Sequence, residues 1–353
     1  MSELFLPSLE ISGYRGLRHL VIPKLGRVNL IVGKNNVGKT SLLEALWLYT
    51  RFRKKIGLLS ALTHLLLSRE EIEDSSDLEG KNHSLRHFFS GRKANGSKPE
   101  IQIGCLDSDG NQMPAPLMLR FDKNEIEFPS SGSSRDAISF HDTLKLVRPT
   151  ANEGGDGLSI KSRMESTDYI EANGLSWKEI TYLWDRVSLT PHEEDIVKAL
   201  KIIDKDVARI GFIGESSDLI GHRIPMVLLE GENKPIPLRS AGEGMNKLLG
   251  ITLALVNAND SVLLIDEVES GLHYSIQYDM WRLIFATARE LNVQVFATTH
   301  SWDCVEAFQQ AAVEDAEAYG MLIRLEAKGE ETKVTLFDER RLSIATKEHI
   351  EVR

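Results

Sequence analysis

The sequence predicts an α/β fold built on a mixed sheet, with antiparallel N-terminal strands and an inserted helical lobe. Three observations lead to this fold class. A short apolar run at 27–32 passes through a glycine-rich turn into a helical stretch. Apolar strands and amphipathic helices alternate between residues 261 and 310, which is the order of a parallel sheet. Alternating apolar residues near both ends of the chain are typical of antiparallel hairpins.

The N-terminal part is expected to contain strands, a helix and a hairpin in succession. The hairpin turn "DSDGN" carries two aspartates, but it lacks the distant closing glutamate of a calcium loop. We therefore interpret it as a turn. The predicted elements are two strands with a turn at 8–22, a buried strand at 27–33, helices at 40–52 and 60–80, the hairpin at 100–122, and loops at 129–136 and 151–157.

The helical lobe contains a sequence, "TPHEEDIVKALKIIDKDVARI", with a helix start signal. Thr190 is the expected cap, Pro191 the first helical residue, and Glu193 completes a capping box. One apolar stripe follows, and it favours core packing over a partner groove; it comprises Ile196, Leu200, Ile203, Val207 and Ile210. We expect one domain, 1–353, divided into a lobe at 1–158, a helical insertion at 159–235, and a lobe at 236–353.

Composition excludes several classes of protein. The chain has 353 residues, a net charge of −10, and no apolar run long enough to span a membrane. It also lacks a recognisable signal peptide, and its two cysteines are far apart, so we expect reduced thiols in the cytoplasm. The negative charge argues against a surface that coats nucleic acid. "RFRKK" at 51–55 is either a local basic patch or the solvated end of a helix.

Residues 33–40, "GKNNVGKT", match the phosphate-binding pattern G-x-x-x-x-G-K-[ST] between a predicted strand and a predicted helix. The glycines let the backbone N–H groups face phosphate oxygens, and the helix N-terminus adds partial positive charge. Lys39 is expected to reach the β and γ phosphates, Thr40 to bind Mg²⁺, and Ser41 to bond a phosphate oxygen. The predicted nucleotide-binding residues here are Gly33, Lys34, Asn35, Asn36, Val37, Gly38, Lys39, Thr40 and Ser41.

Acidic and imidazole side chains follow the next two buried strands. Asp266 ends "VLLID", at the strand end where such sheets bind ligands, and it is expected to hold Mg²⁺ through water. Glu267 is placed to orient or deprotonate an attacking water, and His300, after "VFATT", to contact the γ-phosphate. The candidate catalytic residues are Glu267, His300 and Lys39. Adenine is favoured over guanine, because "ENKPI" at 232–236 lacks the aspartate of a guanine-reading motif.

A second candidate anion site lies in "RSAGEGMNK", residues 239–247, just before an apolar helical run. Alone, Ser240 and Gly242 could form an ordinary helix cap. The hydroxyl and the backbone N–H at a helix N-terminus are equally suited to bind an anion.

The order of these motifs resembles the ABC-type ATPases. In that family the segment matched by residues 239–243 is the signature motif, which caps the γ-phosphate held by a partner's phosphate-binding loop. The resemblance therefore implies a homodimer, or a higher oligomer, around two ATP–Mg²⁺. The stretches "LEISGYRGL", "GKNNVGKTSLLEAL" and "DEVESGLHYSIQ" resemble RecF, SMC and OLD-like ATPases. By this resemblance residues 270–273 cross the dimer interface, and Arg15 either approaches the nucleotide or lies in a surface turn.

The chain departs from these families in the position of its glutamines and in its size. No glutamine occurs between Gln112 and Gln277, so the usual glutamine after the phosphate-binding loop is missing or lies earlier, at Gln102 or Gln112. The interval before residue 239 lacks the sustained heptads of SMC arms. Only 53 residues follow His300, too few for the nuclease domain of OLD proteins.

The resemblance suggests an ATP-hydrolysing regulatory protein of a bacterial antiphage or DNA-maintenance system. Its expected partner is a separately encoded effector such as a nuclease or toxin; DNA is a candidate partner, and no membrane partner is expected. The alternatives are a nucleotide-gated scaffold with little turnover, and the ATP-binding subunit of a membrane transporter.

Overall fold

The structure is a computed structural model, and part of the chain lies outside its description. The predicted helix beyond residue 69, the turn at 108–111, Gln112 and the loop at 151–157 lie outside the described residues. The described residues are 4–54, 57–69, 100–107, 116–122, 125–129, 135–139, 168–214, 223–314, 319–329, 331–338, 341, 342 and 344.

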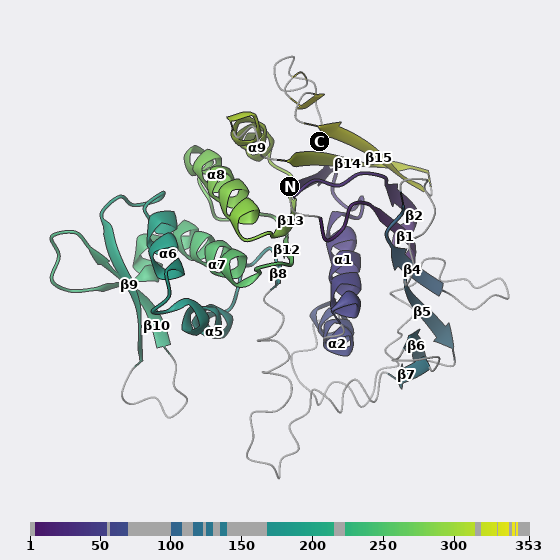
Figure 1. Cartoon of the computed structure of the whole chain (residues 1–353), viewed down its shortest axis with the longest axis horizontal. Coiled ribbons are helices and arrows are strands. Elements are labelled where there is room, and N and C mark those ends of the chain that lie inside the picture. Colours follow the sequence, from purple (N-terminus) through teal and green to yellow (C-terminus); the bar gives the residue numbers. More distant parts are fainter. Residues whose placement is uncertain are drawn as a thin grey trace, which may run out of the picture.

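A six-stranded mixed sheet forms the centre of the fold, in the order β15-β14-β3-β13-β12-β8 (Figure 1). Its members are parallel to their neighbours except β15, which is antiparallel to β14. The predicted mixed α/β sheet is thereby confirmed. The strands are β3 (Val28–Gly33), β8 (Tyr169–Ile170), β12 (Val262–Ile265), β13 (Gln294–Thr298), β14 (Gly320–Lys328) and β15 (Glu331–Asp338).

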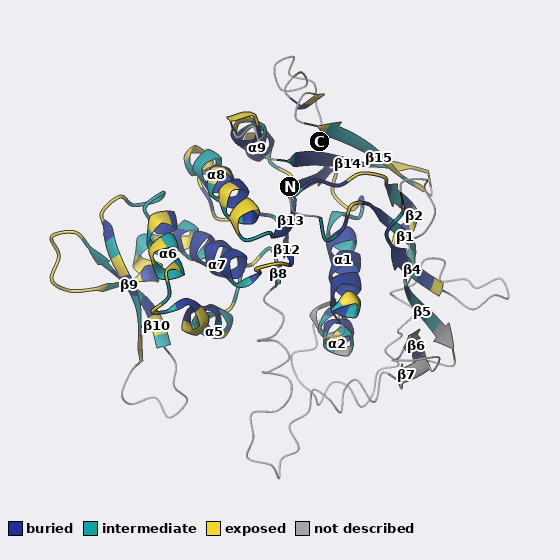
Figure 2. Ribbon diagram, viewed as in Figure 1, coloured by how far each residue is buried: buried dark blue, intermediate teal, exposed yellow. Residues whose placement is uncertain are grey.

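Helices cover both faces of this sheet because its inner strands are apolar on both sides. In β12, Leu263 and Ile265 pack into one core cluster, whereas Val262 and Leu264 pack into the other. This is the pattern expected of a buried parallel strand, which is apolar throughout. Figure 2 shows the inner strands dark, as buried elements. On one face lies α1 (Lys39–Arg53); on the other lie α7 (Glu243–Asn257), α8 (Tyr274–Glu290) and α9 (Trp302–Glu314).

A second six-stranded sheet, entirely antiparallel, packs beside α1 in the order β2-β1-β4-β5-β6-β7. The predicted N-terminal strands and the hairpin after residue 100 belong to it. The β6–β7 hairpin was not predicted. The elements are β1 (Leu9–Tyr14), β2 (Leu17–Ile22), β4 (Glu100–Gly104), β5 (Leu117–Asp122), β6 (Glu125–Pro129) and β7 (Arg135–Ser139), with α2 (Leu58–Arg69) after α1.

The inserted lobe contains helices and a three-stranded antiparallel sheet, β11-β10-β9. The long helix predicted after Thr190 is wrong in its second half, because α6 ends at Leu200 and Val207 and Ile210 lie on β9. Between them Asp206 donates its N–H to the Asp204 carboxylate at 3.0 Å, a side-chain turn that competes with the helix. The lobe comprises α5 (Trp177–Val187), α6 (His192–Leu200), β9 (Val207–Gly214), β10 (Arg223–Leu229), β11 (Ile236–Pro237) and the 3₁₀ helix η3 (Leu238–Ala241).

The predicted capping box at the start of α6 is also absent. The Thr190 hydroxyl donates to the Val187 carbonyl at 2.6 Å, and Glu193 accepts from the Leu189 N–H at 2.9 Å. The residue before α6 is Pro191, with no side-chain cap. Within the described part of the chain, no helix has the length and apolarity required to cross a membrane.

Of the basic stretch at 51–55, residues 51–54 are described, and they do not form a fully solvated helix end. Arg51 is buried, and its Nη2 lies 2.6 Å from Oδ1 of Asp168, which precedes β8. The indole Nε1 of Trp47 donates to the same oxygen at 3.1 Å, and Lys54 Nζ lies 4.0 Å from Oδ2. These contacts join the end of α1 to the edge strand of the central sheet.

We predict that Arg51→Met lowers the free energy of unfolding by about 3 kcal/mol, because it leaves a mostly buried carboxylate with less compensation. Adding Asp168→Asn should recover part of this loss. Urea unfolding of both single variants and the double variant measures the coupling. Additive losses would contradict the claim that the two side chains stabilise the fold as a pair.

Candidate functional site

The phosphate-binding loop joins β3 to α1 and is already closed by internal contacts. The Lys39 ammonium donates to the carbonyls of Gly33 at 2.8 Å and Lys34 at 3.3 Å. Burial lowers the pKa of Lys39, and the nearby Asp266, Glu267 and Glu269 carboxylates oppose that shift.

The first turn of α1 has the character of an anion site. Its N-cap is Gly38, with φ of 107° and no side-chain cap. Residues 39–42 include no acid and begin with a lysine, the reverse of what stabilises a free helix N-terminus. The backbone N–H groups therefore suit a bound phosphate.

Asp266 lies at the point where four elements meet. Its Oδ2 accepts from the Thr40 hydroxyl on α1 at 3.0 Å, and its Oδ1 accepts from the Thr298 hydroxyl at the end of β13. Its backbone N–H donates to the carbonyl of Ile170 on β8 at 2.8 Å. The two residues predicted to bind Mg²⁺, Thr40 and Asp266, are thus in direct contact despite their separation in the sequence. An adjacent hydroxyl and carboxylate are oxygen ligands of the kind that Mg²⁺ prefers.

Glu267 and His300 leave the same edge of the sheet. Glu267 has φ of 46°, a left-handed conformation that is uncommon for a non-glycine residue, and its N–H donates to Thr298 Oγ1 at 2.9 Å. The Nδ1 of His300 lies 3.7 Å from Oε1 of Glu267 and 3.7 Å from Oε1 of Glu269. The Glu267 side chain is partly exposed, so its carboxylate is accessible at this edge of the sheet.

The segment at 239–243 begins α7 but is not an ordinary serine cap. Ser240 is exposed and lies in η3, and the N-cap of α7 is Gly242, with φ of 100° and no side-chain cap. A Cβ built on Gly242 meets nothing within 4 Å. Open space at this helix N-terminus leaves the Ser240 hydroxyl and the helix N–H groups accessible.

Arg15 and Gln102, which the sequence suggested for contacts near the nucleotide, lie in different parts of the antiparallel sheet. Arg15 follows β1 in the left-handed region, and its Nε lies 2.9 Å from Glu44 on α1, so its side chain reaches the helix of the phosphate-binding loop. Gln102 lies on β4 in the antiparallel sheet, paired with Ser12 of β1. The residue that leaves β8 beside Asp266 is Glu171, whose Oε1 lies 2.7 Å from His64 Nε2. Glu171 could hardly be predicted from sequence patterns, because β8 is only two residues long.

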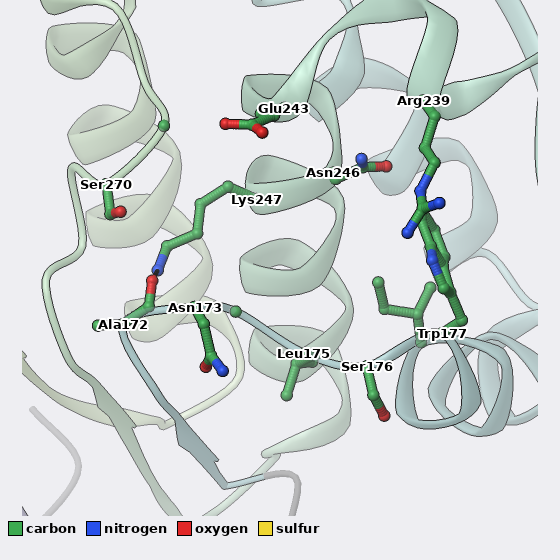
Figure 3. A pocket seen from close by; sticks show the side chains of 13 residues that line it. Ala172, Asn173, Leu175, Ser176, Trp177, Arg239, Glu243, Asn246, Lys247 and Ser270 are labelled. Atoms are coloured by element: carbon green, nitrogen blue, oxygen red, sulfur yellow. Dashed lines mark hydrogen bonds between the residues drawn. The ribbon is translucent and has the colours of Figure 1, made fainter.

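A pocket of about 710 Å³ lies beside the start of α7, and sequence reasoning missed it. Figure 3 shows Lys247 reaching from α7 toward Ala172, whose carbonyl its Nζ approaches at 3.3 Å. On the opposite side Arg239 lies over the Trp177 ring, 4.9 Å from its centroid. Burial lowers the pKa of Lys247 to about 8, although Glu269, Asp266 and Glu267 oppose that shift. Lys247 is buried because α5 and the loop after β8 pack around it, and both are distant from it in the sequence.

The fold and this arrangement of residues define an ATPase of the ABC type. The chain belongs to the family described as "AAA domain, putative AbiEii toxin, Type IV TA system", whose sequence profile matches residues 28–303. The match runs from β3 to the beginning of α9 and so includes all the residues predicted to bind nucleotide or to act in catalysis.

Known proteins agree with this assignment. The chain is 24% identical over 348 residues to an "ATP/GTP phosphatase" of Helicobacter pylori, covering 86% of this chain and 88% of the relative. Its fold is similar to an SMC head bound to the C-terminal winged-helix domain of ScpA, with a TM-score of 0.51, 15% identity, and 97% and 99% of the two chains covered. It is also similar to an SMC head with an extended coiled coil bound to the C-terminal domain of ScpA, derived from Pyrococcus furiosus. Here the TM-score is 0.53 and the identity 12%, with 98% of this chain and 100% of the other covered. The predicted resemblance to SMC heads is confirmed at the level of the fold.

We predict that Lys247 makes stability depend on pH. At pH below about 8 the lysine is protonated in both states, and the folded state bears the full cost of burying it. Between about 8 and 10.5 the unfolded chain binds more protons, so stability rises with pH. Relative to Lys247→Met, the wild type should gain about 3 kcal/mol over that range, estimated at about 1.4 kcal/mol per pKa unit. Urea unfolding at several pH values measures this, and a constant difference between the two proteins would contradict it.

Proposed function

We propose that this ATPase binds ATP with Mg²⁺, dimerises around two nucleotides and hydrolyses them. The observation that carries the proposal is the convergence of Lys39, Thr40, Asp266 and Glu267 at one sheet edge, with His300 next to Glu267. These residues come from three separate stretches of the sequence, and each has the chemistry that phosphoryl transfer requires. The name of the Helicobacter pylori relative, an ATP/GTP phosphatase, supports the same activity.

Each residue has a distinct part in the proposed reaction. The N–H groups at the start of α1 and the Lys39 ammonium hold the phosphates, and Ser41 adds a hydroxyl to them. Thr40 and Asp266 would hold Mg²⁺, which when bound neutralises phosphate charge. Glu267 orients a water molecule for attack on the γ-phosphate and accepts its proton, while His300 contacts the phosphate being transferred. Glu171, which follows β8 next to Asp266, is proposed to act beside this water in the place of the family's usual glutamine.

The proposed dimer accounts for the exposed start of α7. Ser240 presents an exposed hydroxyl, and the first turn of α7, whose N-cap Gly242 has no side-chain capping bond, presents helix N–H groups. These groups would contact the γ-phosphate bound by a second copy. Residues 270–273, which follow the acidic pair, would cross the interface, and Arg15 would approach the nucleotide from the first turn. We propose that residues 1–353 form a single domain, which consists of an N-terminal lobe at 1–158, an insertion at 159–235 and a C-terminal lobe at 236–353.

We further propose that the chain is a cytoplasmic regulatory ATPase of an antiphage or DNA-maintenance system. The family description, which names a toxin and a toxin–antitoxin system, supports this setting. The two SMC heads are described as bound to a partner protein, ScpA, which supports action with a separately encoded effector. DNA is a candidate trigger. A scaffold without turnover would need no Glu267 beside the phosphate site, so hydrolysis is the preferred proposal.

The assignment of Glu267 and Lys39 leads to opposite expectations for two variants. Glu267→Gln should bind ATP with an affinity within about twofold of wild type but release phosphate at least about 100-fold more slowly, because it removes the base. Lys39→Ala should lose most ATP affinity. Nucleotide titration and steady-state phosphate release measure both. Glu290→Gln, on the exposed end of α8, is the matched control and should retain full activity. Wild-type phosphate release by Glu267→Gln would exclude the proposed base.

The proposed composite site can be tested by mixing two inactive variants. In a mixed dimer of Lys39→Ala and Ser240→Arg chains, both lesions fall in one composite site. The other site keeps an intact Lys39 from one chain and an intact Ser240 from its partner. If the sites act independently, each mixed dimer should recover about half the wild-type rate.

Formation of mixed dimers is verified by native mass spectrometry of chains that carry different tags. Each variant mixed with itself provides the baseline rate. Confirmed mixed dimers with no recovered activity, together with full activity of wild-type monomer at high dilution, would contradict a site shared between chains.

A further inference from the structure

We propose that Glu269 is a positioning residue, which holds His300 in the orientation needed for hydrolysis. The inference rests on the proposed role of His300 and adds a residue to which the sequence motifs assigned no part. Glu269 lies in the loop between β12 and α8, two residues after Glu267, and it is buried.

A single carboxylate oxygen of Glu269 contacts His300 at two places. Oε1 accepts the His300 backbone N–H at 3.1 Å and lies 3.7 Å from the ring atom Nδ1. The first contact fixes the main chain just after β13, and the second places the carboxylate charge beside the imidazole of a side chain that is 56% exposed. Because Nδ1 is also 3.7 Å from Glu267 Oε1, the imidazole lies between two carboxylates. A change in Glu269 therefore alters the position of His300 relative to Glu267.

Packing alone does not explain a glutamate at this position. The second carboxylate oxygen, Oε2, is buried and has no hydrogen-bond partner among the described residues. Leaving a buried carboxylate oxygen unpaired is costly, whereas a neutral amide could accept the same backbone N–H. The charge, rather than the hydrogen-bond acceptor, is the property that distinguishes Glu269 from a simple loop cap.

Cations on both flanking helices lie within the electrostatic range of this carboxylate. Among the carboxylates, Glu269 does most to raise the pKa of buried Lys247 on α7, against the lowering by burial. It also raises the pKa of Lys39 on α1. Neutralising Glu269 could therefore act through a lysine instead of through His300. The experiment has to separate these two routes.

Glu269→Gln, made alone and in a His300→Ala background, separates them. The amide keeps the side-chain length and an acceptor for the His300 N–H, but it removes the charge. In the wild-type background kcat for ATP hydrolysis should fall about tenfold, while KM and the Kd for ATP stay within about twofold. In the His300→Ala background the same substitution should change kcat by less than about twofold, because its effect passes through the missing imidazole.

The control is Glu306→Gln, which neutralises a carboxylate on α9 that accepts from the Trp302 indole at 2.6 Å, and it should leave kcat unchanged. If Glu269→Gln does not fold, Glu269→Asp, which keeps the charge but withdraws it from His300, should show the same dependence on background. An equal loss of kcat in both backgrounds, or a loss confined to KM and Kd, would overturn the role of Glu269 alone. An unchanged kcat in His300→Ala itself would instead overturn the proposed role of His300, on which the inference rests.

Discussion

The two hydrogen bonds accepted by the Asp266 carboxylate are the contacts on which the site depends. One comes from Thr40 at the start of α1 and the other from Thr298 at the end of β13, while the Asp266 backbone bonds to β8. Three strands and the helix of the phosphate-binding loop are thereby fixed around one acidic side chain. A buried carboxylate is stable only when its oxygens are paired, so the positions of both hydroxyls are strongly determined. The side chains that follow these strand ends acquire their positions from this arrangement.

Much of this site could be predicted from the sequence because its signals are local. The pattern of a buried strand, glycines and a helix identifies the phosphate-binding loop without knowledge of the fold. Parallel strands place their carboxyl ends at one sheet edge, so Asp266, Glu267 and His300 could be expected to lie together. By contrast, Glu171, Lys247 and Glu269 become notable only through neighbours that are distant in the sequence. Lys247 looks like an ordinary polar residue of a helix until α5 and the loop after β8 cover it.

The inserted lobe shows where periodicity misleads. Ile196 and Leu200 have helical spacing and do lie on α6, and Val207 and Ile210 continue that spacing. The chain nevertheless turns at residues 204–206 and enters a strand rich in β-branched residues, which pairs with β10. In a regular strand, residues three apart face opposite sides, but the register of β9 on β10 shifts between Leu228 and Leu229. Val207 and Ile210 both lie in the same core cluster, so their burial imitates the spacing of a helix. The pairing partner, β10, decides the conformation, and no local pattern indicates it.

The bonds between Lys39 and the carbonyls of Gly33 and Lys34 have a consequence for how this loop meets its ligand. The lysine occupies two carbonyl acceptors of its own loop, so these acceptors are already paired, whereas the start of α1 has no side-chain cap. Phosphate binding is then an exchange of partners, in which the ammonium leaves neutral carbonyl oxygens for charged ones. The favourable energy of that exchange is the difference between two sets of bonds, not the whole of the second set. The loop is therefore preorganised: it has its curled conformation before a nucleotide binds, and little conformational entropy is lost on binding.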